Sequence, residues 1–190
     1  MLQHHLPEAD WRPLVASLGY AAGFVAIELG RQELYTGNTL TAMLPVLHKR
    51  QASMLTNVLR VWLVVLAGNL AGATVFAWAA AWTSTFEAPL RGTFNELGLH
   101  AVSHGLGTAF VKGIFGGWLI ALMIWLMPGA HHARIWVIAL ITWTLAASEL
   151  THVVAGSVEA LFAVFAGVVP LRTYVGNYFV PVVLGNTLGG

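Results

Sequence analysis

Apolar stretches of about 20 residues or more alternate with short polar stretches along this chain, which is the pattern of helices that cross a membrane. Positions 58–82 and 106–127 each form one uninterrupted span, and a shorter apolar stretch begins near position 174. The stretches at 14–47 and 135–169 are too long for a single span and carry polar residues in their middle. We therefore predict five membrane-spanning segments, two of them interrupted.

The two interrupted segments predict broken helices, each made of two half-helices joined by a loop. The interruptions contain Glu28, Arg31–Glu33 and Thr36–Asn38 in the first segment and Ser148–His152 in the second. Unwound backbone at membrane depth is tolerated only inside protein or beside a water-filled cavity, so we expect both breaks to face one internal pathway. Positions 83–105, of mixed polarity, predict a loop between the second and third spans.

Two motifs occur twice in the same order. Glu33–Thr36 recurs 116 positions later as Glu149–His152, and the Gly-Asn pair at 68–69 recurs 117 positions later at 185–186. Internal repeats of this kind predict two homologous halves, with a substrate site at their interface near the bilayer midplane. The glycines are expected to allow close helix packing, and the asparagines can hydrogen-bond across to a loop.

The repeats define the fold class that we expect. One transmembrane domain covers 1–190, with repeat one at about 14–82 and repeat two at about 106–190. Repeat two contains a span, a broken span and a span, whereas repeat one lacks its first helix and the last span of the chain is short. We predict an all-α integral membrane bundle with two inverted repeats, two broken helices and five of an expected six spans.

Composition supports this class. The chain is 57% hydrophobic and 9% charged, with a mean hydropathy of +0.73, whereas soluble domains carry roughly 25% charged residues. The lipid bilayer is therefore its expected surroundings. The formal net charge of +1 argues against a nucleic-acid partner, and the absence of cysteine excludes zinc and iron–sulfur sites built on thiolates.

His152 is the first candidate for chemistry, because it lies in the second break at about mid-membrane. An ionisable group at this depth is of order 3 kcal/mol unfavourable and is a functional hypothesis by default, and imidazole can pass protons near neutral pH. The structural alternative is that His152 caps a half-helix. The repeat pairs His152 with Thr36, and an Asn186 side chain pointing at the second break would complete a His–Asn–Thr cluster.

Charged residues near the breaks allow two interpretations each. Glu149 and Glu33, equivalent in the repeat, either contact a substrate or proton or accept hydrogen bonds from backbone N–H groups that the break frees. Lys112, inside the third span, either draws anions into a vestibule or extends to the membrane surface. Arg31 is expected to pair with Glu28 or Glu33 or to extend to the membrane surface.

The first break supplies a candidate constriction. Leu34 and Tyr35 are bulky and lie beside the Thr36 hydroxyl, which suits a passage that excludes hydrated ions and admits a small molecule. Simple packing is the alternative for this pair. Asn38 is expected to cap the second half-helix, whose N-terminal end is positive and favours an anion.

Other site classes are not supported by the sequence. Glu149 and His152 have the spacing of a carboxylate-bridged metal motif on a helix, but the repeat ends in Thr36 and supplies no second copy. The sequence contains neither a His-Glu-x-x-His motif nor a phosphate-binding glycine loop, and no nucleophile–base pair is visible. We therefore expect no metal, no cofactor and no enzymatic activity.

The motifs around the breaks resemble those of the formate/nitrite transporter family. Leu34–Asn38, Leu-Tyr-Thr-Gly-Asn, resembles the Leu-Phe-Thr-Gly-Asn loop of that family, and positions 180–190 are similar to its last-helix motif Ile-Pro-Val-x-x-Gly-Asn-x-x-Gly-Gly. Glu149–Gly156 lies where the family has Phe-Glu-His-Ser, although two residues here separate Glu from His. A lysine often found ahead of the third span is replaced by His100 and His104.

The resemblance implies an aquaporin-like protomer of six spans, assembled as a homopentamer with one pathway per protomer, that moves small monovalent anions such as formate, nitrite or hydrosulfide. By position it implies that His152, Thr36 and Asn186 line the pathway and that Leu34 and Tyr35 constrict it. We expect a multi-pass, proton-assisted channel or transporter in the inner or plasma membrane. The alternatives are a channel for neutral small solutes and a truncated membrane fragment that does not transport.

Overall fold

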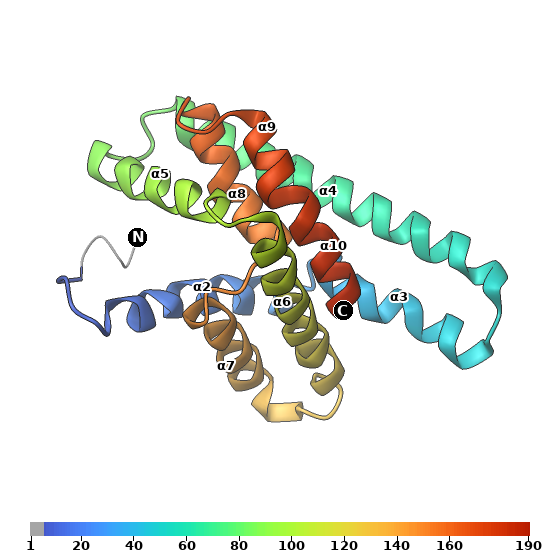
Figure 1. Ribbon diagram of the computed structural model, residues 1–190. Coiled ribbons are helices and arrows are strands. Elements are labelled where there is room, and N and C mark those ends of the chain that lie inside the picture. Colours follow the sequence, from blue (N-terminus) through green and yellow to red (C-terminus); the bar gives the residue numbers. More distant parts are fainter. Residues whose placement is uncertain (1–5) are drawn as a thin grey trace.

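The computed structural model describes residues 6–190, and every regular element in this range is helical (Figure 1). The α-helices are α2 (Arg12–Leu29), α3 (Tyr35–Lys49), α4 (Leu55–Trp82), α5 (Ala88–Val102), α6 (Leu106–Leu126), α7 (Arg134–Ala147), α8 (Val153–Phe165), α9 (Leu171–Thr173) and α10 (Val180–Gly189). Two 3-10 turns, η1 (Ala52–Met54) and η2 (His131–Ala133), and one π-helix, η3 (Tyr174–Phe179), complete the list. The predicted all-α class is confirmed.

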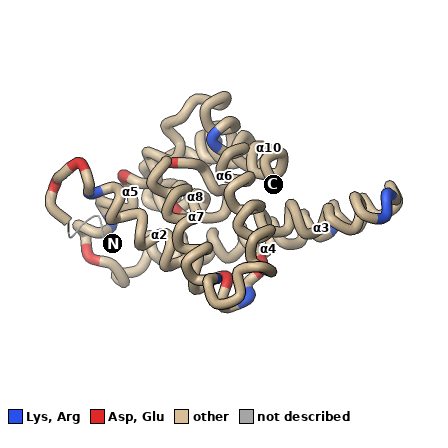
Figure 2. The backbone as a smooth tube through the Cα atoms, turned by 90° about the horizontal axis from the view of Figure 1, so that it is seen from below, with Lys and Arg blue, Asp and Glu red and all other residues tan. Residues whose placement is uncertain are grey.

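Three stretches of helix in the described residues are long and apolar enough to cross a membrane. They are Arg12–Leu29, Ala52–Trp82 and Leu106–Leu126. Large apolar side chains on these helices face outward; Leu63 and Trp82, for example, are 67% and 70% exposed. Figure 2 shows that most of the backbone carries no charge and that several charged positions gather at the far end of α3 and around the N-terminal end. This distribution fits contact with lipid rather than with water.

Both predicted breaks are present, but the predicted loop at 83–105 is wrong. The first interrupted segment divides into α2 and α3, and the second divides into α7 and α8. Most of the predicted loop forms α5, which begins with Pro89 in its first turn and packs along α8. Its mixed polarity marks a helix that lies against the bundle rather than one that crosses the membrane.

The last span is one continuous rod from Leu171 to Gly189, beginning three residues before the predicted start. The wider π-helical turns of η3 lie directly before Pro181. Proline lacks an N–H and its ring crowds the preceding turn, and a locally widened helix relieves that crowding. The rod therefore passes Pro181 without a break.

The most extensive helix contact joins α6 to α10, which cross near the middle of Figure 1. A Cβ on Gly185 of α10 would lie 2.9 Å from the Cα of Gly113 on α6, so only glycine permits this approach. Gly68 of α4, the equivalent of Gly185 in the Gly-Asn repeat, has no neighbour within 4 Å of such a Cβ. The expected packing role is therefore confirmed for Gly185, whereas for Gly68 it stays a prediction, because no part of the described chain packs there.

Candidate functional site

The two helix breaks have the same backbone geometry. Arg31 and Glu149 each follow the end of a helix and adopt left-handed φ angles of 53° and 51°. In each break the next backbone N–H donates to a carbonyl five residues earlier, at 3.0 Å in both cases. The N-cap positions of the following helices are Leu34 and His152. Arg31 thus corresponds to Glu149, and Leu34 to His152, each pair being 118 residues apart.

An asparagine braces each break in the same way. Asn69 of α4 accepts a hydrogen bond from the Tyr35 N–H at 2.8 Å and donates to the Glu33 carbonyl at 2.9 Å. Asn186 of α10 accepts from the Val153 N–H at 2.8 Å and donates to the Thr151 carbonyl at 3.0 Å. Backbone N–H and C=O groups left without a partner at a buried helix end lower the stability of the fold. The Asn69 and Asn186 side chains provide partners for these groups.

The structural repeat corrects the predicted one in its register. The bracing bonds and the left-handed residues match Leu34 with His152 and Arg31 with Glu149, a spacing of 118 rather than 116. The predicted equivalence of Thr36 with His152, and of Glu33 with Glu149, is therefore wrong. Similar residue types in the two tetrapeptides gave the apparent spacing, whereas the backbone geometry fixes the actual one.

The breaks meet at a hydrogen bond between Thr36 and His152. Thr36 Oγ1 lies 2.7 Å from His152 Nε2, and both side chains are almost fully buried. The Ala155 N–H donates to His152 Nδ1 at 3.2 Å, so Nδ1 acts as an acceptor and the neutral imidazole carries its proton on Nε2. The Nε2–H then donates to Thr36, and this bond does not use the hydroxyl proton of Thr36 itself. His152 thus serves both as the N-cap and as a partner of Thr36.

Aromatic and apolar groups enclose this pair. The Phe24 ring meets the His152 imidazole edge to face, with centroids 5.2 Å apart, and Tyr178 donates to the His152 carbonyl at 2.9 Å. Leu34 and Tyr35, the predicted constriction residues, are both buried. The Tyr35 hydroxyl is not free, because it lies 2.6 Å from Thr187 Oγ1.

The Asn186 side chain bonds to the backbone on either side of His152 rather than to the imidazole ring of His152. Its amide bonds to Thr151 and Val153, the residues on either side of His152, and also donates to the Gly113 carbonyl at 2.7 Å. The amide is completely buried. Asn186 therefore fixes the position of the break that carries His152.

A cavity of about 240 Å³ opens beside the first break. Its lining consists of Glu28, Arg31, Gln32, Glu33, Leu34, Gly37, Asn38, Thr41 and Ile124. Asn38, predicted to cap α3, instead donates to the Glu33 carboxylate at 2.7 Å and to the Leu34 carbonyl at 3.0 Å. The cavity therefore brings polar groups up to the N-terminal end of α3.

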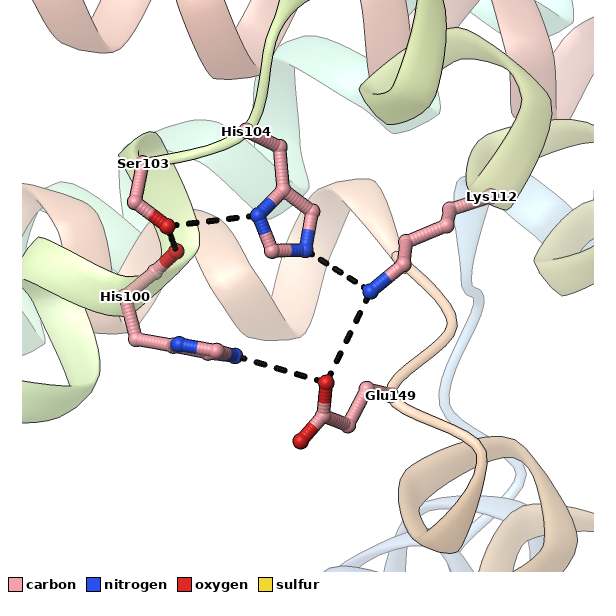
Figure 3. A network of polar contacts seen from close by, with 5 residues as sticks. All are labelled: His100, Ser103, His104, Lys112 and Glu149. Atoms are coloured by element: carbon pink, nitrogen blue, oxygen red, sulfur yellow. Dashed lines mark hydrogen bonds and ion pairs between the residues drawn. The ribbon is translucent and has the colours of Figure 1, made fainter.

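Lys112 and Glu149 belong to a second polar group, which lies beside the second break (Figure 3). Lys112 Nζ is 2.8 Å from His104 Nε2 and 3.6 Å from Glu149 Oε2. His100 Nε2 is 3.7 Å from the same carboxylate oxygen. The side chains of His100 and Glu149 are 56% and 61% exposed, and that of Lys112 is 24% exposed. We call these four side chains the lysine–histidine cluster.

The expected bracing of the breaks by carboxylates is wrong. Glu149 pairs with cations of the lysine–histidine cluster, and Glu33 accepts from the Asn38 side chain. Among the described residues, Arg31 forms no ion pair with Glu28 or Glu33. Side-chain amides carry out the bracing, which needs a donor and an acceptor at one position.

The sequence provides only a weak signal, or none, for several residues of the site. His100 and His104 were noticeable as replacements for a familiar lysine, and Asn69 as half of a repeated Gly-Asn pair. Phe24 gave no signal, because one aromatic residue in an apolar helix resembles any other. Within residues 6–190, no group of three histidine or acidic side chains is placed to hold a metal ion.

A family model described as formate/nitrite transporter matches residues 1–190. The chain is 39% identical over 177 residues to "Inner membrane protein YfdC" of Escherichia coli (strain K12), covering 93% of this chain and 57% of that protein. It is 25% identical over 195 residues to "Probable formate transporter" of Methanothermobacter thermautotrophicus, covering 93% of this chain and 70% of that protein.

A solved structure has the same fold. "Pentameric formate channel with formate bound" superposes with a TM-score of 0.77 at 20% identity, covering 94% of this chain and 78% of that one. The chain described here spans little more than half the length of YfdC and about three quarters of the solved channel subunit.

Proposed function

Because the chain belongs to the formate/nitrite transporter family, we propose that it forms a transmembrane pathway for small monovalent weak-acid anions of the formate and nitrite type. Two relatives support this class of solute, one named a probable formate transporter and one a formate channel with formate bound. We assign the protein no enzymatic reaction.

The observation that carries the proposal is the buried hydrogen bond between Thr36 and His152. It joins the two helix breaks, and it combines a hydroxyl donor with a group that can hold a proton. A bare anion at this depth would be several kcal/mol unfavourable, whereas a neutral weak acid would not. A site that offers a hydroxyl hydrogen bond in apolar surroundings suits a solute that can cross as a neutral weak acid.

The transport step follows from this arrangement. The anion accepts a hydrogen bond from the Thr36 hydroxyl while His152 Nε2 holds that hydroxyl in place. A proton taken up from water on the side from which the anion arrives is bound by the solute oxygen, while the imidazole keeps its own proton on Nε2 and donates it in a hydrogen bond to the Thr36 oxygen. The solute crosses as the neutral acid and releases the same proton on the far side, so each crossing moves one anion and one proton together.

The remaining predicted residues take supporting parts in the pathway. Leu34 and Tyr35 narrow it beside Thr36, and Asn38 lines the cavity that leads to the first break. Asn186 is a positioning residue, because it holds the backbone that carries His152. Lys112 and Glu149 stand at the second break, where they set the charge that an arriving anion meets.

We further propose that the protein works as a homopentamer in the inner or plasma membrane. The neighbour of known structure is described as pentameric, and the relative in Escherichia coli is described as an inner membrane protein. Cross-linking of the protein in native membranes tests the stoichiometry directly, and a ladder that stops at two or three subunits would contradict it.

The proposal is tested by anion flux into proteoliposomes under a pH gradient, with formate and nitrite as solutes. Wild-type protein should give flux that rises as the outside becomes more acidic, and His152→Ala should lower that flux at least tenfold, because the Thr36 hydroxyl is then no longer held in place. Thr36→Val should lower flux at least tenfold, because the hydroxyl donor is lost. His131→Ala, in the 3-10 turn η2, and Thr74→Val, on α4, are the matched controls and should behave as wild type.

The same measurement separates the alternative functions. Equal flux of an uncharged solute such as urea, independent of pH, would favour a neutral-solute channel. Absence of flux for every solute from a well-folded, correctly inserted oligomer would favour a protein that does not transport.

A further inference from the structure

The lysine–histidine cluster has the composition of an anion-binding site but contains its own anion. Lys112, His100 and His104 provide one permanent and two titratable positive groups, contributed by α6, by α5 and by the loop between them. The carboxylate of Glu149 lies between Lys112 and His100 (Figure 3). Its other oxygen points away from the cluster in the same view.

The contacts of Glu149 are loose. Its Oε2 lies 3.6 Å from Lys112 Nζ and 3.7 Å from His100 Nε2, beyond the 2.7–3.2 Å of a direct hydrogen bond. The side chain is 61% exposed, so water and small ions can reach the carboxylate. An ion pair of this kind is weak and easily exchanged.

The cationic side of the cluster, in contrast, is held by close hydrogen bonds. Lys112 is fixed by a 2.8 Å hydrogen bond to His104 Nε2, and the other ring nitrogen of His104, Nδ1, contacts Ser103 Oγ at 3.2 Å. The Ser103 hydroxyl donates to the His100 carbonyl at 2.7 Å. The positive side of the cluster is therefore held in position, while its negative side chain can move.

We infer that Lys112 and His100 form a binding site for a small carboxylate or similar oxyanion, in which the Glu149 side chain stands in for the bound anion and competes with it. This inference rests on the proposed function, because it names the place where that anion first binds. Arrival of the solute displaces Glu149 toward solvent, and departure of the solute restores the ion pair. Glu149 is three residues before His152, so at most about 11 Å of extended chain separates this site from the central pair.

The competition makes binding depend on pH in a defined direction. The charged and titratable groups that face His104 are Lys112, His100 and Glu149. His104 stays neutral, because its Nε2 accepts the hydrogen bond from Lys112. Protonation of His100 adds positive charge and strengthens anion binding, whereas protonation of Glu149 removes the competitor. Each of these changes favours the solute at lower pH, where a proton-coupled anion should be loaded.

The inference is tested by titrating purified protein with ¹³C-labelled sodium formate at constant ionic strength and following the broadening of the formate signal. Glu149→Gln should lower the half-saturating concentration about threefold or more, because the competitor is gone while the side-chain shape remains. Lys112→Met should raise it by a similar factor. The double variant should bind with an affinity between those of the two single variants, because His100 remains as a cation and no longer faces the competitor.

Two variants control for charge alone. Glu87→Gln removes a carboxylate at the other end of α5, about 20 Å from His100 along the helix, and Lys49→Met removes a cation at the end of α3. Both should bind formate as wild type. Unchanged or weaker binding by Glu149→Gln, with the fold verified by circular dichroism, would overturn the inference.

Flux measured on the same variants separates this inference from the proposed function. If the protein conducts formate but Glu149→Gln leaves binding unchanged, only the competition is wrong. If the binding shifts occur as described but wild-type protein conducts no anion, the transport function is wrong and the binding site stands.

Discussion

Arg31 and Glu149 occupy the same place in two helix breaks and carry opposite charges. Both lie two residues after the end of a helix, and both adopt the left-handed backbone conformation that L-residues generally avoid. A shared backbone with inverted charge means that the two sides of the centre differ chemically despite their structural similarity. Arg31 lines the cavity beside the first break, whereas Glu149 faces the cations beside the second.

The left-handed positions predict an unusual response to glycine. Arg31→Gly should leave the melting temperature unchanged or raise it, since glycine removes a strain of about 1 kcal/mol at this φ angle. Arg60→Gly, within α4, should instead lower stability by about 1 kcal/mol, because it weakens a regular helix. Thermal unfolding in detergent, followed by circular dichroism, compares the two, and a loss at Arg31 equal to that at Arg60 would refute the backbone argument.

The bracing asparagines should differ in importance. Asn186→Leu leaves the Val153 N–H and two carbonyls without partners in a fully buried place, which should destabilise the protein by about 3 kcal/mol or more. Asn69→Leu removes two hydrogen bonds at a half-exposed place and should cost about 1–2 kcal/mol. Thermal unfolding of both variants measures the difference. Equal losses of stability in the two variants would show that burial does not determine how much each asparagine contributes.

Glycines on α10 and α4 give a matched pair for packing. Gly185→Val should severely destabilise the protein, because a side chain there would collide with the α6 backbone at Gly113. Gly68→Val should be tolerated in the chain described here, since nothing lies within 4 Å of its added Cβ. Yield of folded protein by size-exclusion chromatography reports both results. Loss of folded protein for Gly68→Val would mean that α4 contacts a further helix in the assembled protein.

The lysine–histidine cluster predicts the titration of His104. Burial, with smaller contributions from Lys112 and His100, lowers the pKa of His104 from its usual value, and Glu149 opposes this shift. Lys112→Met should therefore raise the pKa of His104, and Glu149→Gln should lower it further. Titration of the histidine ring resonances by NMR measures both shifts, and movement in the same direction in both variants would contradict the assigned contacts.

The lowered pKa also fixes the sign of a stability change. Between the folded-state pKa of His104 and its unfolded value of about 6.5, the unfolded chain binds more protons than the folded one. The contribution of His104 to stability is therefore fully present above its unfolded pKa of about 6.5. It is lost as the pH falls from this value toward the folded-state pKa. Lys112→Met should make the acid-induced loss smaller, which unfolding at pH 7.5 and pH 5 would measure.

Apolar length and polar interruption were enough to predict the spans and both breaks. They could not reveal α5, whose Arg91, Asn95 and Glu96 make it look like a loop although the helix packs on α8. The sequence also predicted that Thr36 and His152 lie together in one cluster, and their hydrogen bond agrees with this, but the predicted equivalence of the two residues in the repeat is wrong. The two residues are partners across the centre rather than equivalents, and only hydrogen-bond geometry distinguishes these relationships.

The polar contacts of the breaks are of two kinds, with consequences for movement. Asn69 ties the first break to α4 and Asn186 ties the second to α10, so each break is held by a helix of its own repeat. The bonds from Thr36 to His152 and from Tyr35 to Thr187 run between the repeats. If the repeats slide past one another, these two bonds are the ones exchanged at the breaks, at about 1 kcal/mol each, while both breaks keep their shape. The two repeats thus act as rigid bodies joined at the Thr36–His152 and Tyr35–Thr187 hydrogen bonds, and a passing solute can replace the hydrogen bonds that it disrupts.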